Sequence, residues 1–170
     1  MAPTKFSDEK IVDMMEDKFP FVLFDRYFPE LATNYVIIDN EVASFNLVKH
    51  LLEKGYKKVA VITTNTHLYT MQLRYSGYNT AHEDMGVAPE QELYGEVDQK
   101  DYENSIAEVL DNIFEKVPDV DAFFFTTHVL ASHFFRYCSR KGINWDFGYA
   151  CIHEEKIFDV LAPHMNVAQL

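Results

Sequence analysis

Histidine is the side chain with the widest chemical range in this sequence, because it binds metal ions and exchanges protons near neutral pH. Seven histidines occur among the 170 residues, and His128 and His133 lie five residues apart. On a helix that turns ~100° per residue, these two side chains would point about 140° away from each other. This spacing does not suit shared coordination of a metal ion, so we expect no metal site and no cofactor.

The sequence lacks the motifs that mark common cofactor and catalytic sites. It contains no G-x-G-x-x-G, no P-loop glycine pattern, no G-x-S-x-G, no H-E-x-x-H and no paired C-x-x-C. A doubly wound α/β enzyme would have to use Asp25 and a histidine as acid and base. A turnover that is lost in Asp25→Ala would support that alternative, but without a motif we expect a protein that is not an enzyme.

Acidic residues outnumber basic ones by 27 to 15, which gives a net charge of −12. The field of the chain therefore repels polyphosphate, and we expect no direct binding to nucleic acid. The apolar stretches 59–62 and 122–125 are far shorter than the roughly 20 residues that span a bilayer. The N-terminus turns polar where an export signal would be apolar, so we expect a cytoplasmic protein with no membrane partner. Cys138 and Cys151 are expected to be reduced and buried.

Short runs rich in Val, Ile and Phe alternate with longer stretches of helical spacing, which is typical of βαβ units around a parallel sheet. The expected fold class is therefore α/β with a doubly wound parallel sheet. Most runs are continuously apolar, so both faces of their strands should be covered. The predicted strands are 21–24, 35–38, 59–62, 122–125 and 147–152, with a weaker one near 92–94.

Polar caps and glycines mark the ends of the intervening helices. Asn40 is the expected N-cap of the helix that follows the second predicted strand. Glycines stop three predicted helices, at Gly55, Gly86 and Gly142. The later helices are expected at 69–85, 101–116 and 129–141. The segments before residue 25 and after Pro163 do not fit the same sheet, and we interpret them as parts of a neighbouring lobe.

Six segments carry more information in their order than any of them carries alone. Together they resemble the effector-binding region of the lactose-repressor/galactose-repressor (LacI/GalR) family of transcription regulators, over about residues 19–169. The segments are FPFVLFDR (19–26), VIIDN (36–40), HLLEKGYKKVAVIT (50–63), QLRYSGY (72–78), DVDAFFFTTHVLA (119–131) and APHMNVAQ (162–169).

The resemblance implies the fold of type I periplasmic sugar-binding proteins, whose two lobes hold a small effector, typically a sugar or a purine, between them. Residues 1–34 would end the N-terminal lobe, and residues 35–163 would form the C-terminal effector-binding lobe. Residues 164–170 would form a strand that crosses back towards the N-terminal lobe. DNA would be bound only through a head that this sequence does not contain. The resemblance also implies a homodimer, in which effector binding sets the lobe closure and thereby the spacing of two heads.

The resemblance places effector-binding residues at the end of the first predicted strand and on the predicted helix 69–85. Asp25 matches an acidic position that faces the effector, and a carboxylate at the end of a strand can accept hydrogen bonds from two sugar hydroxyls. Arg74 matches an effector-contacting arginine, whose planar fork of donors suits a hydroxyl pair or a carboxylate. Thr70, one turn before Arg74, could add a hydroxyl to the same wall.

Two positions depart from the pattern of the family. The chain has Thr127 and His128 where the family usually has Asn-Asp, and His153 and Glu154 where it usually has Asp-Asp. Both pairs would lie at the mouth of the cleft, so we add Thr127, His128 and His153 to the expected effector-binding residues. Fewer carboxylates and two additional imidazoles favour an anionic or differently substituted ligand over a neutral hexose. A capping role for His128 and a plain loop position for His153 stay open.

Tyrosines near these positions could stack against the face of a sugar ring. The three candidates are Tyr27, Tyr69 and Tyr75. Most of the other aromatic residues should simply form the core.

Taken together, the sequence predicts the effector-sensing and dimerisation domain of a cytoplasmic transcription regulator. The alternative is a periplasmic solute-binding protein of a sugar transporter, which shares the fold. An export segment encoded upstream would favour that alternative, whereas an upstream helix-turn-helix would favour the regulator.

Overall fold

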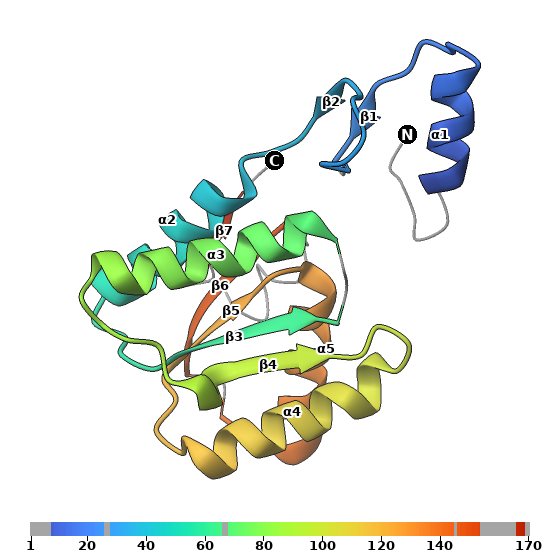
Figure 1. The fold of residues 1–170 in the computed structure, drawn as a ribbon. Helices are drawn as coiled ribbons and strands as arrows, with labels where there is room; N and C mark the ends of the chain where they lie inside the picture. The colour runs from blue at the N-terminus through green and yellow to red at the C-terminus, as the bar shows by residue number, and fades with distance from the viewer. Residues whose placement is uncertain (1–7, 26–27, 66–67, 145, 154–165, 169–170) are drawn as a thin grey trace.

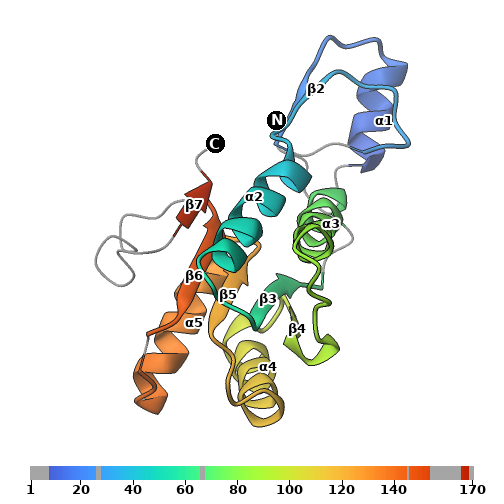
Figure 2. The same cartoon turned by 90° about the vertical axis from the view of Figure 1, so that its left-hand side faces the viewer.

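A computed structural model of the chain describes residues 8–25, 28–65, 68–144, 146–153 and 166–168. Five parallel strands form the main sheet in the order β4-β3-β5-β6-β7. Helices α2 and α3 cover one face of this sheet, and α4 and α5 cover the other (Figure 1, Figure 2). The strands are β3 (Val59–Thr64), β4 (Tyr94–Val97), β5 (Ala122–Phe125), β6 (Gly148–Ile152) and β7 (Asn166–Ala168). The predicted α/β, doubly wound parallel sheet is therefore confirmed.

The central strands divide their side chains between two cores, because successive residues of a strand point to opposite faces. On β5, Ala122 and Phe124 pack under α2 and α3, whereas Phe123 and Phe125 pack under α4 and α5. Every residue of β3, β5 and β6 is buried. This explains why these strands read as continuous apolar runs in the sequence.

The helices of the main unit begin and end close to the predicted positions. They are α2 (Asn40–Glu53), α3 (Tyr69–Asp84), α4 (Tyr102–Lys116) and α5 (His128–Lys141), with a short 3-10 helix η1 (Gln91–Leu93) before β4. Gly55, Gly86 and Gly142 follow three of the C-termini with positive φ angles, as predicted. The expected capping role of Asn40 is wrong. Asp39 is the N-cap of α2, and its carboxylate accepts a hydrogen bond from the N–H of Val42.

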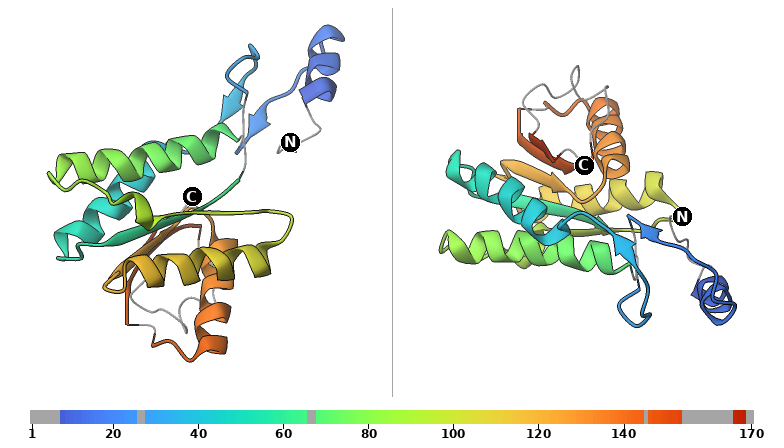
Figure 3. Two further views of the ribbon diagram at one scale, coloured as in Figure 1. Left: turned by 60° about the horizontal axis from the view of Figure 1, so that its bottom comes forward. Right: turned by 90° about the horizontal axis from the view of Figure 1, so that it is seen from above.

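A second, two-stranded parallel sheet stands beside the main unit. It pairs β1 (Leu23–Phe24) with β2 (Tyr35–Val36), and α1 (Asp8–Glu16) precedes it (Figure 3). The second predicted strand was expected to be covered on both faces, and this expectation is wrong because Tyr35 and Val36 are both exposed. The segment after Pro163 also differs from its prediction, since β7 pairs with β6 inside the main sheet.

The two cysteines are buried in the main unit, as predicted. Cys138 on α5 and Cys151 on β6 are not joined in a disulfide. Within the described residues, no helix is both long and apolar enough to cross a membrane.

Candidate functional site

The strand order of the main sheet identifies the edge at which a ligand would bind. The chain leaves β3 towards β4 on one side and leaves β5 towards β6 on the other, so the connections diverge between β3 and β5. In open α/β sheets, ligands bind outside the carboxyl ends of the strands at such a switch point. Thr63, Thr126 and Thr127 lie at this edge, and His153 follows the neighbouring strand β6.

Arg74 projects from α3 to this edge and is almost fully buried, with 2 % of its surface exposed. Its Nε donates a hydrogen bond to Oδ1 of Asn40 at 2.7 Å, and one terminal nitrogen donates to the carbonyl oxygen of Thr126 at 2.6 Å. The Oγ1 of Thr126 in turn donates to Oγ1 of Thr63 at 3.3 Å. The guanidinium therefore connects the start of α2 to the ends of β3 and β5.

His128 and His153 face each other beside this guanidinium. Their ring centroids are 5.8 Å apart, and their planes are nearly perpendicular, at 83°. Within the described residues, the Nδ1 atom of His153 and the Oγ1 atom of Thr127 are shielded from solvent but have no hydrogen-bond partner. An unmet buried polar group costs about 1–3 kcal/mol, so these atoms are suited to a ligand or a bound water.

The charges around His153 act on its imidazole from several elements. Burial lowers the pKa of His153 from its ordinary value, and the positive charge of Arg74 lowers it further. The carboxylate of Asp25 acts in the opposite direction, and His128 has a smaller lowering effect on this pKa. His153 is therefore predominantly neutral near pH 7, and its titration depends on the charges of the candidate site.

Asp25 and His153 share an uncommon backbone conformation. Asp25 follows β1 with a φ of 69°, and His153 follows β6 with a φ of 77°. Residues other than glycine seldom adopt this left-handed region, and they are frequent in ligand sites when they do. The N–H of Asp25 donates to the carbonyl oxygen of Val36 at 3.0 Å, which fixes the turn at the end of the small sheet.

The structure brings most of the predicted site residues to one place. Arg74 contacts the strand end that Thr127 follows, His128 and His153 face each other, and the charge of Asp25 acts on His153. Thr70 is buried one turn before Arg74 on α3. Effector contacts by these six residues remain predictions. Tyr27 and Glu154 lie outside the described residues.

The stacking role expected for Tyr75 does not fit the structure. Its ring packs edge-on against Tyr94 at 5.0 Å between centroids and stacks on Tyr78 at 6.0 Å. It lines a hollow of about 280 Å³ beside η1 and β4, in which neither Arg74 nor the histidines take part. Tyr75 follows Arg74 directly on α3, and the helical rotation of ~100° per residue turns its side chain to another side of the helix.

Three site residues were not foreseen in the sequence, namely Asn40, Thr63 and Thr126. Asn40 belongs to the quoted segment VIIDN but was interpreted as a cap, although its amide oxygen accepts from Arg74. Thr63 and Thr126 look like ordinary ends of apolar strands. A polar residue at the carboxyl end of a fully buried strand was the signal that could have identified them.

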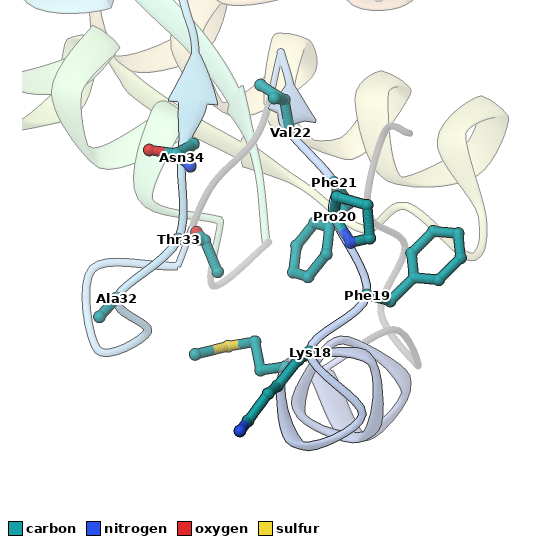
Figure 4. A pocket seen from close by; sticks show the side chains of 9 residues that line it. Lys18, Phe19, Pro20, Phe21, Val22, Ala32, Thr33 and Asn34 are labelled. Carbon is teal, nitrogen blue, oxygen red and sulfur yellow. The ribbon is translucent and has the colours of Figure 1, made fainter.

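A groove of about 660 Å³ lies apart from these residues, between α1 and the small sheet. Its lining comes from Met15 and from residues 18–22 and 32–34, and Figure 4 shows Phe19, Pro20, Phe21 and Val22 along one wall. Phe19 is 60 % exposed and Val22 is 51 % exposed. None of the six predicted site residues lines this groove.

The described residues contain no group of three or more His, Cys, Asp or Glu placed to hold a metal ion.

Comparison with known proteins identifies the family of the chain. Residues 48–164, well over half of the chain, match the family model of the periplasmic binding protein-like domain. The chain belongs to this family. Among solved structures, this periplasmic binding protein-like domain is similar to a sugar-binding transcriptional regulator of the LacI family from Escherichia coli, complexed with phosphate. The TM-score is 0.79 at 19 % identity, over 98 % of this chain and 60 % of that one.

Two curated relatives of the domain are also transcription regulators. A probable HTH-type transcriptional regulator EndR of Paenibacillus polymyxa is 33 % identical over 79 residues, which are 45 % of this chain and 23 % of that protein. The HTH-type transcriptional regulator GalR of Escherichia coli K12 is 23 % identical over 105 residues, 61 % of this chain and 31 % of that protein. The chain thus spans less than a third of each relative. The resemblance to LacI/GalR regulators is confirmed, and the relatives support an effector-sensing domain over a periplasmic transporter protein.

Proposed function

We propose that this periplasmic binding protein-like domain senses a small effector, a sugar or sugar derivative, within a transcription regulator. The observation that carries the proposal is the position of Arg74, buried at the switch point and bonded to Asn40 and to Thr126. An arginine whose rotamer is fixed in this way is preorganised to bind a ligand. Asp25, Thr70, Thr127, His128 and His153 would add polar contacts around it.

The proposal includes the division of the chain into lobes. Residues 1–34 would end an N-terminal lobe, residues 35–163 would form the effector-binding lobe, and residues 164–170 would lead back. The pairing of β1 with β2 supports a second lobe, because two strands of two residues each are too small to form a stable sheet alone, and it moves the start of the effector-binding lobe from residue 35 to residue 37. In the whole regulator, a head outside this chain would bind DNA. The domain would pair with a second copy of itself, and the regulator would act in the cytoplasm.

The mechanism that we propose is differential binding without any chemical change in the effector. An effector that contacts Asp25 next to the small sheet and Arg74 next to the main sheet would favour one relative orientation of the two sheets. Regulation would then follow from the difference in effector affinity between two orientations. The curated relatives are regulators rather than enzymes, which is consistent with this non-catalytic role.

A ligand screen tests the proposal directly. Neutral sugars, uronic acids and sugar phosphates are screened for an increase in the melting temperature of the chain, and ligands that raise it are measured by calorimetry. Arg74→Lys should weaken the binding of any such ligand by about tenfold or more, because lysine cannot reproduce a planar fork of donors. Arg140→Lys on the exposed face of α5 serves as the matched control. Equal affinity in the two variants would refute the proposed site.

A further inference from the structure

The site contains an imidazole and a hydroxyl, those of His153 and Thr127, whose hydrogen-bonding capacity the described protein groups do not fully use. Nδ1 of His153 and Oγ1 of Thr127 are buried without partners among these groups. His128 begins α5, and its ring is 5.8 Å from that of His153. An imidazole or a hydroxyl can donate to an incoming oxygen, and a protonated imidazole donates from both of its nitrogens.

The charged groups that act on His153 come from three elements. Arg74 on α3 contributes a positive charge, Asp25 after β1 contributes a negative one, and His128 lies across on α5. Burial and Arg74 lower the pKa of His153, so the imidazole is ready to gain a proton when a negative charge arrives. Asp25 would repel such an anion, and this repulsion provides a test with a definite sign.

We propose that the effector carries an anionic group, a carboxylate or a phosphate monoester, which His128, His153 and Thr127 hold while His153 takes up one proton from solvent. The inference rests on the proposed function, since it names the class of effector for the same site. The neutral imidazole of His153 becomes an imidazolium, and its new positive charge pairs with the anion. The ligand itself is unchanged apart from being bound.

The sign of the resulting pH dependence follows from linkage. The bound anion raises the pKa of His153 above its value in the free protein, so the complex holds more protons than its separated parts. Affinity for an anion of fixed charge therefore rises as the pH falls through the pKa of the complex. It levels off below the pKa of the free protein. A neutral sugar should show no such dependence on His153.

Sulfate is a suitable probe, because its charge does not change over the pH range in which histidine titrates. The imidazole resonances of the whole 170-residue chain are titrated by NMR with sodium sulfate and with sodium chloride at equal ionic strength. We expect sulfate to raise the apparent pKa of His153 by about one unit. The resonances of His50, exposed on α2, should respond equally to both salts. No specific rise at His153, or an equal rise at His50, would overturn the inference.

Three variants extend the test to affinity. His128→Gln and Thr127→Val should each weaken sulfate binding at least about threefold, with the fold verified by circular dichroism. Asp25→Asn should strengthen sulfate binding, because it removes a negative charge from the site. A purely structural role of Asp25 would not give this gain, so weaker sulfate binding in Asp25→Asn would count against the inference.

The inference and the proposed function can fail separately. If a neutral sugar binds in an Arg74-dependent way while sulfate leaves the titration of His153 unchanged, the anion site is refuted and the effector domain stands. If sulfate raises the pKa of His153 but no sugar, uronic acid or sugar phosphate binds, the anion site stands and the sugar-sensing function is refuted.

Discussion

Nε of Arg74 on α3 donates to Oδ1 of Asn40, the first residue of α2, over 2.7 Å. Both residues are almost fully buried, with 2 % and 1 % of their surfaces exposed. The amide nitrogen of Asn40 also donates to the carbonyl oxygen of Ile38 at 3.2 Å. Asn40 is thus held on both sides, and it fixes the guanidinium at the edge of the sheet where the candidate site lies.

Asn40→Ala should destabilise the domain by about 1–3 kcal/mol, because it leaves a buried donor of Arg74 without this acceptor. The free energy of unfolding in urea measures the effect. Asn46→Ala on the exposed face of the same helix is the matched control, and it should change stability by less than about 0.5 kcal/mol. Equal stabilities of the two variants would show that the Arg74–Asn40 bond contributes nothing.

Gly77→Ala on α3 should destabilise the fold by about 3 kcal/mol, although alanine is normally the better helix former. A Cβ atom at Gly77 would lie 2.8 Å from Cβ of Ser44 and would also clash with the carbonyl oxygen of Glu41, a backbone atom of α2. Thr80→Ala, exposed on the same helix, should be nearly neutral or slightly stabilising. A stabilising Gly77→Ala would mean that α2 and α3 do not approach so closely.

His82 should make the domain less stable in mild acid. Burial lowers the pKa of His82, and the hydrogen bond of its Nδ1 with the carbonyl oxygen of Tyr78 only partly offsets this. In mild acid, His82 therefore binds a proton more readily in the unfolded chain than in the folded chain. The contribution of neutral His82 to the stability of the fold is fully present above the pKa of about 6.5 that His82 has in the unfolded chain. It is lost as the pH falls towards the lower pKa that His82 has in the folded chain.

Unfolding free energies at about pH 7.5 and about pH 5.5 test this sign. The loss between the two pH values should be smaller in His82→Gln than in the natural chain, whereas His50→Gln, at an exposed position, should retain the full loss. Part of the loss should persist in His82→Gln, because burial also lowers the pKa of His133 and His153. An unchanged loss in His82→Gln would refute the assignment.

His153→Gly should be more stable than His153→Ala by about 1 kcal/mol, because glycine adopts a φ of 77° without the steric cost that any Cβ introduces. The same comparison at Thr80, inside α3, should have the opposite sign, with Ala better than Gly by about 1 kcal/mol. Urea unfolding of the four variants provides the measurement. If Ala were better than Gly at both positions, the left-handed conformation of His153 would be wrong.

The sequence predicted the main sheet well because its strands are buried on both faces. Ala122–Phe125 illustrates this, since four consecutive apolar residues are typical of a strand that is covered on both faces. Helix ends were also predictable where a glycine such as Gly142 adopts a positive φ. These signals are local, and they need no knowledge of the packing.

The remaining features depend on contacts between distant residues. Asn40 and Asp39 are both good capping residues, and only the fold shows that Asn40 turns to Arg74 while Asp39 caps the helix. Tyr75 and Arg74 are neighbours in sequence, yet they point to different sides of α3. The resemblance to a family identified Arg74, but the pairing of His128 with His153 required the coordinates.

The short link between the small sheet and the main unit has a mechanical consequence. Only residues 37–39 separate β2 from α2, and Asn40 begins that helix. A rotation of the small sheet would therefore pull first on the residue that anchors Arg74, before any strand of the main sheet had to shift. The guanidinium of Arg74 is bonded both to Asn40, next to the link, and to Thr126 at the end of β5. Movement of one sheet relative to the other would therefore directly change the shape of the space beside the guanidinium.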